Sequence, residues 1–495
     1  MNTLGIDIGS SFIKASVYDA QTGRSLSKAT VPDLEMRINA PHHGWAEQSP
    51  ELWWEYSRQA VIQAIALSGL SPASINAIGI TYQMHGLVCL DRAGNPLRPS
   101  IIWCDSRAVE TGDLLTARLG MDYCRKHLLN SPGNFTASKL LWVKENEPEI
   151  FEKIHRVMLP GDYIGYKLTG EINTTLSGLS EGIFWDFPNH RISEDLLMAS
   201  GISKDLLAPI VPAFGEQGRL LPAIAHELGL KAGIPLTYRS GDQPNNAFSL
   251  GVVNPGEVAA TAGTSGVVYG ITDKMIADPL NRINAFAHVN HSRVATRLGI
   301  LLCINGAGSL NSWLRKTIGC GKDYLRMNDE AMRIPAGSEG LMILPFGNGA
   351  ERMLRNSEPG GRVLGLNFNR HTQAHLFRAA QEGVAFAFRY GMDAMKDAGI
   401  SPSVIRACHT NMFLSPVFRQ TLADITGVAI DLYDTDGSAG AAKGAALGSG
   451  FYSDISEACS KMEKMSVIEP SAESSSSMEA YSQWKSLLDG ILKSE

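Results

Sequence analysis

The chain has 495 residues, of which 44% are hydrophobic and 19% charged, and its formal net charge at pH 7 is -6. This length exceeds what one hydrophobic core usually supports, so we expect two domains of an ordinary globular protein. The lack of a basic excess argues against a nucleic-acid partner. The sequence opens without a basic, apolar leader and contains no run of eighteen or more apolar residues, which predicts a cytoplasmic protein without a membrane partner.

The first motif is a predicted β-hairpin over residues 3–18, where two apolar runs are joined by a Gly-Ser-Ser turn. Asp7 lies inside the first run, and a carboxylate there is costly unless it meets a cation, so we expect it to face a cleft and a metal. Ser10 and Ser11 could donate hydrogen bonds to a phosphate, with Lys14 as a charge partner. A dinucleotide-binding fold is the competing interpretation, but no Gly-x-Gly-x-x-Gly pattern opens a helix here.

Two polar clusters follow predicted strands in the first half. The strand at 77–82 leads to Met84 and His85, and this histidine is either a core residue or a group that contacts substrate at a strand end. Trp103 and Asp105 follow another short strand, and together they could stack on and hydrogen-bond a polyol. A solvated strand end is the alternative interpretation of that second cluster.

Residues 108–235 are predicted to be mostly helical, with a buried loop at 159–164. Asp242 then follows a β-type run and precedes a proline that suits the first turn of a helix. Its side chain is therefore expected where a strand becomes a helix, which is where α/β folds place their chemistry. The alternative is an ordinary helix N-cap.

A glycine-rich loop follows the strand predicted at 258–261. Its Thr264 and Ser265 lie between glycines, so backbone N–H groups are free to wrap an anion, although an ordinary turn has the same composition. A later strand runs into Gly306 and Gly308 before another helix, where a nucleotide could approach the backbone closely.

Helices are predicted at 373–398 and 415–426, and a helix of small residues at 436–448 would let a ligand or another helix pack tightly against it. A short linker at 474–477 should precede a terminal helix whose apolar face, over 478–492, docks back on the protein. Each half opens with a strand, a loop containing glycine and a second strand, which suggests two related domains.

In their order and spacing, these motifs resemble those of the FGGY carbohydrate kinases, members of the actin-like ATPase superfamily, over nearly the full length. The resemblance is carried by Gly5-Ile-Asp-Ile-Gly-Ser-Ser, Gly44-Trp-Ala-Glu-Gln, Gln83-Met-His-Gly, Trp103-Cys-Asp-Ser-Arg, Gly241-Asp242, Gly263-Thr-Ser-Gly, Glu382-Gly383 and Gly437-Ser-Ala-Gly-Ala-Ala. It implies an α/β fold of two actin-like ATPase (ribonuclease H-like) domains with a catalytic cleft between them. Residues 1–253 would bind sugar and carry the catalytic base, and residues 254–495 would bind nucleotide.

The resemblance also implies ATP-dependent phosphorylation of a sugar with Mg²⁺. By position, Asp242 would be the catalytic base, and Asp7 and Asp242 would be the metal-associated carboxylates. The sugar site would contain Met84, His85, Trp103, Asp105, Asp242 and Gln243. The nucleotide site would contain Ser10, Ser11, Lys14, Thr264, Ser265, Gly306, Gly308 and Asn411. Such chemistry asks mainly for positioning, charge neutralisation and one base.

D-xylulose is the sugar that the resemblance implies, giving D-xylulose 5-phosphate in pentose catabolism. Two positions depart from the pattern of kinases for this sugar: Asn411 stands within a Thr-Asn-Met run where a glycine triplet is usual, and Gln243 stands where Asn is frequent and glycerol kinases carry Gln. A kinase of ribulose, L-xylulose, gluconate or glycerol is therefore an alternative. A non-catalytic, nucleotide-binding sugar sensor is another, against which Asp242 argues. A homodimer is left open.

Overall fold

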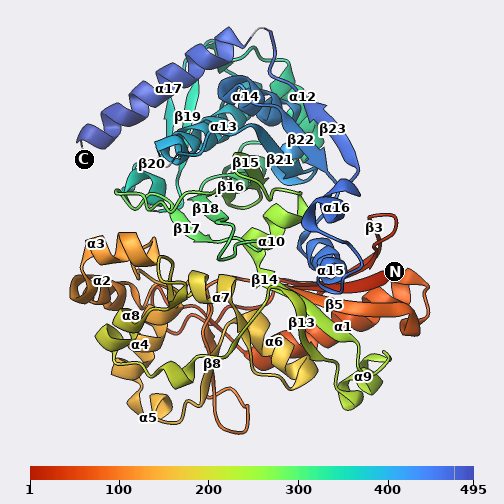
Figure 1. Ribbon diagram of the computed structural model, residues 1–495. Coiled ribbons are helices and arrows are strands. Elements are labelled where there is room, and N and C mark those ends of the chain that lie inside the picture. The colour runs from red at the N-terminus through yellow and green to blue at the C-terminus, as the bar shows by residue number, and fades with distance from the viewer. Residues whose placement is uncertain (350, 398, 473, 495) are drawn as a thin grey trace.

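Two twisted β-sheets, one in each half of the chain, organise this computed structural model, which describes residues 1–495 except 350, 398, 473 and 495. Figure 1 shows the first half of the chain below and the second half above. Helices α10 (Asp242–Ser249) and α15 (Gly437–Gly448) lie between the two sheets, where the halves meet. Their position makes this junction the natural place for a shared site.

The first sheet has the strand order β13-β14-β5-β1-β2-β3. The first three strands of the chain form an antiparallel meander, whereas β5 and β14 continue the sheet in parallel with β1. The strands are β1 (Asn2–Ile8), β2 (Ile13–Asp19), β3 (Arg24–Val31), β5 (Ile75–Tyr82), β13 (Phe214–Arg219) and β14 (Pro235–Gly241). Because helices cover both faces of its centre, β5 and β14 are buried along nearly their whole length.

The second sheet repeats this topology. Its order is β17-β18-β16-β15-β21-β22-β23, and β15, β16 and β18 form the meander while β21 and β22 run parallel to β15. The strands are β15 (Glu257–Ala262), β16 (Gly266–Thr272), β17 (Asn284–Ala287), β18 (Leu298–Ile304), β21 (Val404–Cys408), β22 (Ile430–Tyr433) and β23 (Lys464–Ile468). The sheets thus confirm the two related α/β domains expected from the sequence.

Helices flank both sheets, and the two predicted at 373–398 and 415–426 are present with bounds close to those ranges. In the first half, α1 (Pro50–Ser68) packs on β2 and β3. In the second half, α13 (Gln373–Asp397) packs on α14 (Pro416–Thr426), and the last residue of the range predicted for α13 lies outside the described part of the chain. Helices α11 (Gly308–Thr317) and α12 (Tyr324–Met332) complete this layer, with the antiparallel pair β19 (Met342–Phe346) and β20 (Gly360–Leu364) beside them.

The segment between β5 and β13 is rich in short helices, as predicted. Its main helices are α2 (Val109–Leu119), α4 (Thr136–Asn146), α6 (Pro160–Thr169), α7 (Leu176–Glu181) and α8 (Glu194–Ser200), and α9 (Pro222–Leu228) precedes β14. Short strand pairs connect them, namely β4 (Glu47–Gln48) with β7 (Ser100–Ile101), β6 (Val88–Leu90) with β8 (Arg156–Met158), β9 (Thr174–Thr175) with β12 (Ile210–Val211), and β10 (Trp185–Asp186) with β11 (Arg191–Ile192). Helix α7 contacts β17, so this segment reaches the second half.

Two local predictions were wrong. The segment predicted as a buried loop at 159–164 is buried, but from Pro160 on it is the start of α6, because Pro160 suits a first helical turn and Asp162 accepts a hydrogen bond from the Leu159 N–H. Asp162 also forms a buried ion pair with Arg239 of β14, with 2.9 Å between Oδ1 and Nε. Residues 475–477 of the linker predicted at 474–477 are likewise helical, because α17 (Ser475–Ser494) begins at Ser475.

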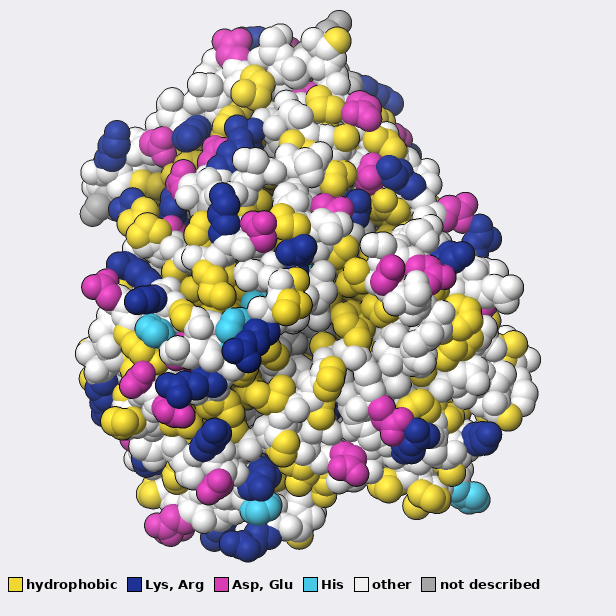
Figure 2. All heavy atoms as spheres, viewed as in Figure 1, with side chains coloured by type: hydrophobic (Ala, Val, Ile, Leu, Met, Phe, Trp, Pro, Cys, Tyr) yellow, Lys and Arg dark blue, Asp and Glu magenta, His cyan; other side chains and the backbone are white. Residues whose placement is uncertain are grey.

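The terminal helix α17 docks on the second half as predicted. Its Trp484 is fully buried and donates a hydrogen bond from Nε1 to the carbonyl oxygen of Ile343, 2.9 Å away. Among the described residues, no helix is long and apolar enough to span a membrane. Figure 2 shows acidic and basic side chains interspersed over one face of the molecule, without a broad area of one sign.

Helix α15 belongs to the second half by sequence but packs on β1, β5 and β14 of the first sheet. Glycines in β1 and β5 allow this helix to approach the sheet closely. A Cβ on Gly5 would lie 1.9 Å from the Ser438 carbonyl oxygen, and one on Gly79 would lie 2.1 Å from that of Ala441. The side-chain amide of Asn245, on α10, donates to the Gly437 carbonyl oxygen at 2.9 Å. The domain boundary expected between residues 253 and 254 stays a prediction. The strands of the two sheets do fall on either side of it, but α15 from the second half packs on the first sheet.

Candidate active site

Asp242 is the first residue of α10, directly after β14, which lies between β13 and β5 in the first sheet. Its carboxyl group is half-buried, and burial together with the negative charge of Asp7 raises its pKa to about 7. Hydrogen bonds from the backbone and side chain of Gln243 oppose that change. The parallel strand and the following helix thus place a weakly acidic carboxyl group at the junction between the halves.

Asp7 lies near the end of β1, opposite Lys14 of β2 in the hairpin register. Burial raises the pKa of Asp7 to about 6, with Lys14 lowering it and Asp436 raising it. A Cβ on Gly437 would lie 2.5 Å from Asp7 Oδ2, so the start of α15 lies directly against this carboxyl group. Among the described residues, Lys14 is the only cation that acts on Asp7, and no cation is among the main influences on Asp242. Two carboxyl groups with so little neighbouring positive charge suit a bound divalent cation.

The first glycine loop joins β1 to β2. Its Gly9 N–H donates to the Phe12 carbonyl oxygen at 3.1 Å, and the side-chain amide of Gln48 donates to the Ser10 carbonyl oxygen at 2.7 Å. Ser10 and Ser11 are half-buried and follow the end of β1 at Ile8. The loop is therefore held in place by its own backbone and by Gln48.

The second glycine loop joins β15 to β16 and carries the exposed residues Thr264 and Ser265. The start of α11 fixes it, since the Gly308 N–H donates to the Gly263 carbonyl oxygen at 2.8 Å and the Ser309 N–H to that of Thr264 at 3.1 Å. The close contact needs a glycine, because a Cβ at Gly308 would lie 2.4 Å from the Gly263 oxygen. The two loops hold matching places in the two repeated sheets.

A cavity of about 790 Å³ opens beside the second loop. It brings together three of the residues predicted to bind nucleotide, Thr264, Gly308 and Asn411, the last with a left-handed φ of 53°. Ser265 and Gly306 are not among its lining residues, and Gly306 packs against the Pro345 carbonyl oxygen. Ser10, Ser11 and Lys14 lie on the first sheet and would meet a ligand from the other side.

The cavity also has walls that sequence reasoning missed. They come from α11, α12 and the 3₁₀ helix η6 (Asn411–Leu414) and include Asn311, Trp313, Lys316, Tyr324, Leu325, Asn328 and Met412. The only signal in the sequence is that Trp313 and Lys316 lie three residues apart, on one face of the predicted helix. The cavity has the volume of a small-molecule pocket, and its aromatic side chains could stack on a flat ring.

Met84 and His85 follow β5, as a strand-end position predicts, and Met84 lies beside Gly241. A Cβ on Gly241 would lie 2.6 Å from Met84 Cγ and 2.4 Å from Glu181 Oε2, so a glycine is required there. The pKa of His85 falls to about 3, chiefly through burial and then through the charge of Lys139, so its ring is neutral at pH 7. Its Nδ1 lies 2.9 Å from the Glu181 carbonyl oxygen, which can only accept, so Nδ1 carries the proton. Nε2 is left as an acceptor.

Lys139 and Glu181 are two further buried residues that sequence reasoning missed. The Lys139 ammonium donates to the carbonyl oxygens of His85 and Ile102, each at 2.9 Å, and so ties the two strand ends together. Burial lowers the pKa of Lys139 to about 7, and it raises that of Glu181 well above its usual value. Both residues lie in the helix-rich segment, where no sequence motif marks them.

Trp103 and Asp105 occupy different surroundings although they are two residues apart. Trp103 is 52% exposed, and its ring is available to a ligand. Asp105 is fully buried, and its carboxylate accepts hydrogen bonds from the backbone N–H groups of Ala46 at 2.5 Å and Arg107 at 2.9 Å, and pairs with the Arg107 guanidinium at 2.7 Å. A sugar could reach Asp105 only if it displaced these donors, so its predicted contact with substrate stays a prediction.

The repeated sheets, the crossing helices and the loops between them define the class of the protein as a two-domain α/β fold of the actin-like ATPase type. Residues 2–249 match the N-terminal domain of the FGGY family of carbohydrate kinases, and residues 258–450 match its C-terminal domain. The chain therefore belongs to this family. It is an ATP-dependent carbohydrate kinase, and the enzyme prediction is confirmed over the sensor alternative.

Three relatives illustrate the similarity. The xylulose kinase of Escherichia coli (strain K12) is 32% identical over 445 residues, which cover 90% of this chain and 88% of that protein. The solved xylulose kinase of Rhodospirillum rubrum has a TM-score of 0.88 and 25% identity, with 99% of both chains covered. A glycerol kinase of Plasmodium falciparum solved with ADP has a TM-score of 0.88 at 21% identity, covering 99% of this chain and 98% of that chain, and it shares the fold.

Proposed function

We propose that this kinase transfers the terminal phosphoryl group of ATP to the terminal hydroxyl of D-xylulose, forming D-xylulose 5-phosphate. The observation that carries the proposal is the half-buried Asp242 where the two halves meet, with a pKa of about 7 that burial and the charge of Asp7 raise. The similarity to xylulose kinases over nine-tenths of the chain supports the choice of sugar.

In this proposal Asp242 accepts the proton of the attacking hydroxyl as the new oxygen–phosphorus bond forms. A general base is most effective when its pKa lies near the working pH, because it is then ionised often enough and still basic enough to take the proton. A pKa of about 7 satisfies both conditions, whereas an exposed aspartate would be a much weaker base.

Asp7 and Asp242 would hold Mg²⁺ together with the phosphate oxygens of ATP. Among the described residues no group of three or more acidic, histidine or cysteine side chains could hold a metal on its own, and Mg²⁺ is commonly bound by one or two carboxylates plus substrate phosphates. When bound, the ion neutralises charge on the transferring phosphoryl group. Ser10 and Ser11 on one loop, and Thr264 and Ser265 on the other, would contact the phosphates.

The cavity lined by Trp313, Tyr324 and Asn411 would take the adenine and ribose. On the sugar side, neutral His85 would accept a hydrogen bond from a hydroxyl at Nε2, and the exposed ring of Trp103 would stack against the carbon chain. A group tuned to meet a sugar hydroxyl is left unpaired by a substrate that lacks it, which allows discrimination on the order of 10⁴.

The test is release of ADP with D-xylulose, L-xylulose, D- and L-ribulose, gluconate and glycerol, compared as kcat/KM. We expect D-xylulose to be the best substrate and glycerol to be very poor. Gln243, which favours the glycerol alternative, makes glycerol the informative competitor. A clear preference for glycerol or gluconate would overturn the assignment, whereas a preference for ribulose would change only the sugar. A cytoplasmic location and a homodimer stay predictions.

A further inference from the structure

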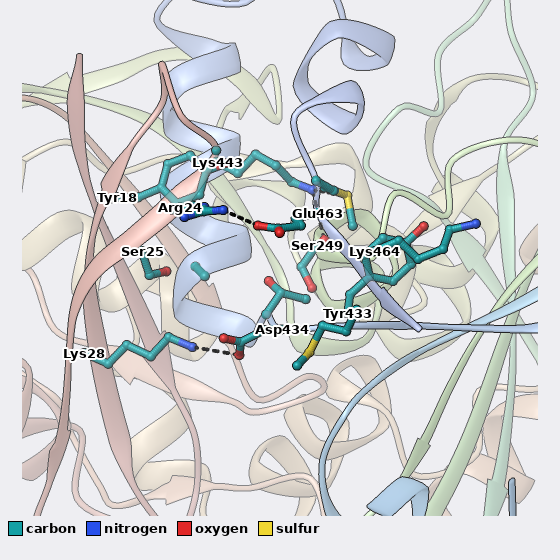
Figure 3. A pocket seen from close by; sticks show the side chains of 15 residues that line it. Tyr18, Arg24, Ser25, Lys28, Ser249, Tyr433, Asp434, Lys443, Glu463 and Lys464 are labelled. Carbon is teal, nitrogen blue, oxygen red and sulfur yellow. Dashed lines mark hydrogen bonds and ion pairs between the residues drawn. The ribbon is translucent and has the colours of Figure 1, made fainter. Parts of the chain in front are cut away.

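A second cavity, of about 540 Å³, lies between the outer strands of the two sheets (Figure 3). We call it the hinge pocket. It is lined by β2 and β3 of the first sheet, by the end of β22 and the start of β23 in the second, and by α15 between them. Neither Asp242 nor either glycine loop is among its lining residues, so it is separate from the site described above.

Ion pairs cross the hinge pocket from one half of the chain to the other. Lys28 on β3 lies 3.2 Å from Asp436 and 3.8 Å from Asp434, and Arg24 pairs with Glu463. Figure 3 shows Arg24 and Lys28 reaching across from the first sheet. Most of these side chains are exposed, and exposed pairs contribute at most about 1 kcal/mol each, so they can rearrange when a better partner enters.

Lys443 on α15 supplies a third cation, in a different environment. It is only 3% exposed, and its ammonium donates to the carbonyl oxygens of Phe248 at 2.9 Å and Ser249 at 3.0 Å and, more weakly, to Met462 Sδ at 3.3 Å, which is the contact that an anion would replace. No carboxylate among the described residues forms an ion pair with it. Burial lowers the pKa of Lys443. An anion in the pocket would therefore stabilise the charged form of a lysine that now has only neutral partners.

The remaining features of the hinge pocket indicate the kind of anion. Arg24, Lys28 and Lys443 line one cavity together with Lys464 and with the carboxylates of Asp434 and Glu463. A phosphate group offers three acceptor oxygens and about two negative charges, so it could replace those carboxylates as the partner of the cations. A bare phosphate would occupy a small part of 540 Å³, which is within the range of pockets for small metabolites. Figure 3 also shows the hydroxyl groups of Ser25 and Tyr433 on the walls, where they could meet a polar organic body.

We propose that the hinge pocket is a second ligand site, which binds a small phosphate monoester such as a sugar phosphate through Arg24, Lys28 and Lys443. Because the walls belong to both halves, the ligand would hold them at one relative angle. Helix α15 carries Lys443 at the pocket and Gly437 against Asp7, about 9 Å apart along the helix axis. The proposal does not depend on which sugar is the substrate.

The test uses the full-length protein saturated with Mg²⁺ and a non-hydrolysable ATP analogue, so that the phosphate loops of the active site are occupied. Ribose 5-phosphate, ribose and inorganic phosphate are then added separately, and amide hydrogen exchange is followed by mass spectrometry. We expect ribose 5-phosphate to slow exchange at 23–29 and 462–466, and ribose to have no effect. Equal effects of ribose and its phosphate, equal affinity for inorganic phosphate, or protection confined to residues 9–12 and 263–266 would each overturn the proposal.

Variants locate the binding further. Lys443→Met removes the buried charge at similar size and should weaken ribose 5-phosphate binding about tenfold or more. Because Lys443 also holds two carbonyl groups, the exposed Arg24→Gln serves as a second variant, with an expected loss of about threefold to tenfold. Lys231→Met, which changes an exposed lysine outside the hinge pocket, is the matched control. Wild-type affinity in folded Lys443→Met and in Arg24→Gln would contradict the proposal.

Discussion

The indole Nε1 of Trp103 donates a hydrogen bond to the hydroxyl oxygen of Ser10, 3.2 Å away. The sequence predicts that Trp103 binds sugar and that Ser10 binds phosphate. This contact therefore links a predicted sugar-binding residue to a predicted phosphate-binding residue of the same domain. The tryptophan follows β7 and the serine follows β1, and 93 residues separate them in the sequence. The bond therefore fixes Ser10 of the first loop relative to the ring that we propose stacks on the sugar.

Trp103 and Ser10 should be energetically coupled in catalysis. Trp103→Phe keeps a flat ring but removes the N–H donor, and Ser10→Ala removes the acceptor. We expect each change to lower kcat/KM by roughly threefold to tenfold, and the double variant to be little worse than either single one, because both remove the same bond. Steady-state kinetics of the four proteins measure the coupling. Fully additive losses would show that the contact plays no part in turnover.

Asp242→Asn should lower kcat by roughly 10² to 10⁴ while sugar binding is largely kept, because the amide preserves the shape but cannot accept the proton. The exposed Asp273→Asn is the control, since it makes the same chemical change outside the site. Turnover is followed by ADP release and sugar binding by calorimetry. Near-normal turnover in Asp242→Asn would remove it from the role of base.

The same substitution should stabilise the protein at alkaline pH. The carboxyl group of Asp242 has a pKa of about 7 in the folded protein and near 4 when unfolded, so the folded state binds more protons between these values. The free energy of unfolding therefore falls as the pH rises from about 4 to about 7. Without ligands at pH 8, Asp242→Asn should gain on the order of 1–3 kcal/mol, seen as a higher Tm.

This stabilisation should shrink toward pH 4, where the wild-type carboxyl group is protonated in the folded protein. Thermal melting of Asp242→Asn, Asp273→Asn and wild type at several pH values provides the comparison. Identical melting of Asp242→Asn and wild type at pH 8 would mean that the carboxylate is not destabilised by its surroundings. That result would count against the raised pKa on which the proposed base depends.

Trp313→Ala should raise the KM for ATP by about tenfold and leave the KM for the sugar almost unchanged. The indole ring is one wall of the 790 Å³ cavity beside the second loop, and a lost stacking contact with a base costs about 1–3 kcal/mol. Phe451→Ala, at an exposed aromatic residue outside this cavity, is the matched control. An increase confined to the KM for the sugar would place the nucleotide elsewhere.

The sequence predicted the parts of the fold that depend on local periodicity. The hairpin around Ser10, the strand before Met84 and the junction at Asp242 all follow from apolar runs ended by glycine or proline, and the structure has each of them. The loop predicted at 159–164 failed because the helix there is fixed by a cap at Asp162 and a distant partner at Arg239.

The site was harder to predict where tertiary contacts decide it. Trp313 and Tyr324 lie on separate helices, and only packing brings them to one cavity. Lys139 and Glu181 belong to no sequence motif, yet both contact His85. The Glu181 carbonyl oxygen determines that Nδ1 of the His85 ring carries the proton, and Lys139 binds the His85 carbonyl oxygen. Asp105 shows the opposite case, because a motif residue turned out to be enclosed by Arg107. A sequence pattern gives the position of a side chain on its own element, whereas its partners come from elsewhere in the chain.

The packing of α15 on the first sheet has a consequence for how the chain folds during synthesis. The first sheet can be translated completely while one of its faces still lacks the small-residue helix at 437–448, so β1, β5 and β14 keep an apolar surface exposed until the last part of the chain emerges. Neither family domain would then be self-sufficient when expressed alone. A hybrid that joins the first half of one relative to the second half of another would also need matching surfaces at Gly5 and Gly79, where no side chain larger than hydrogen fits.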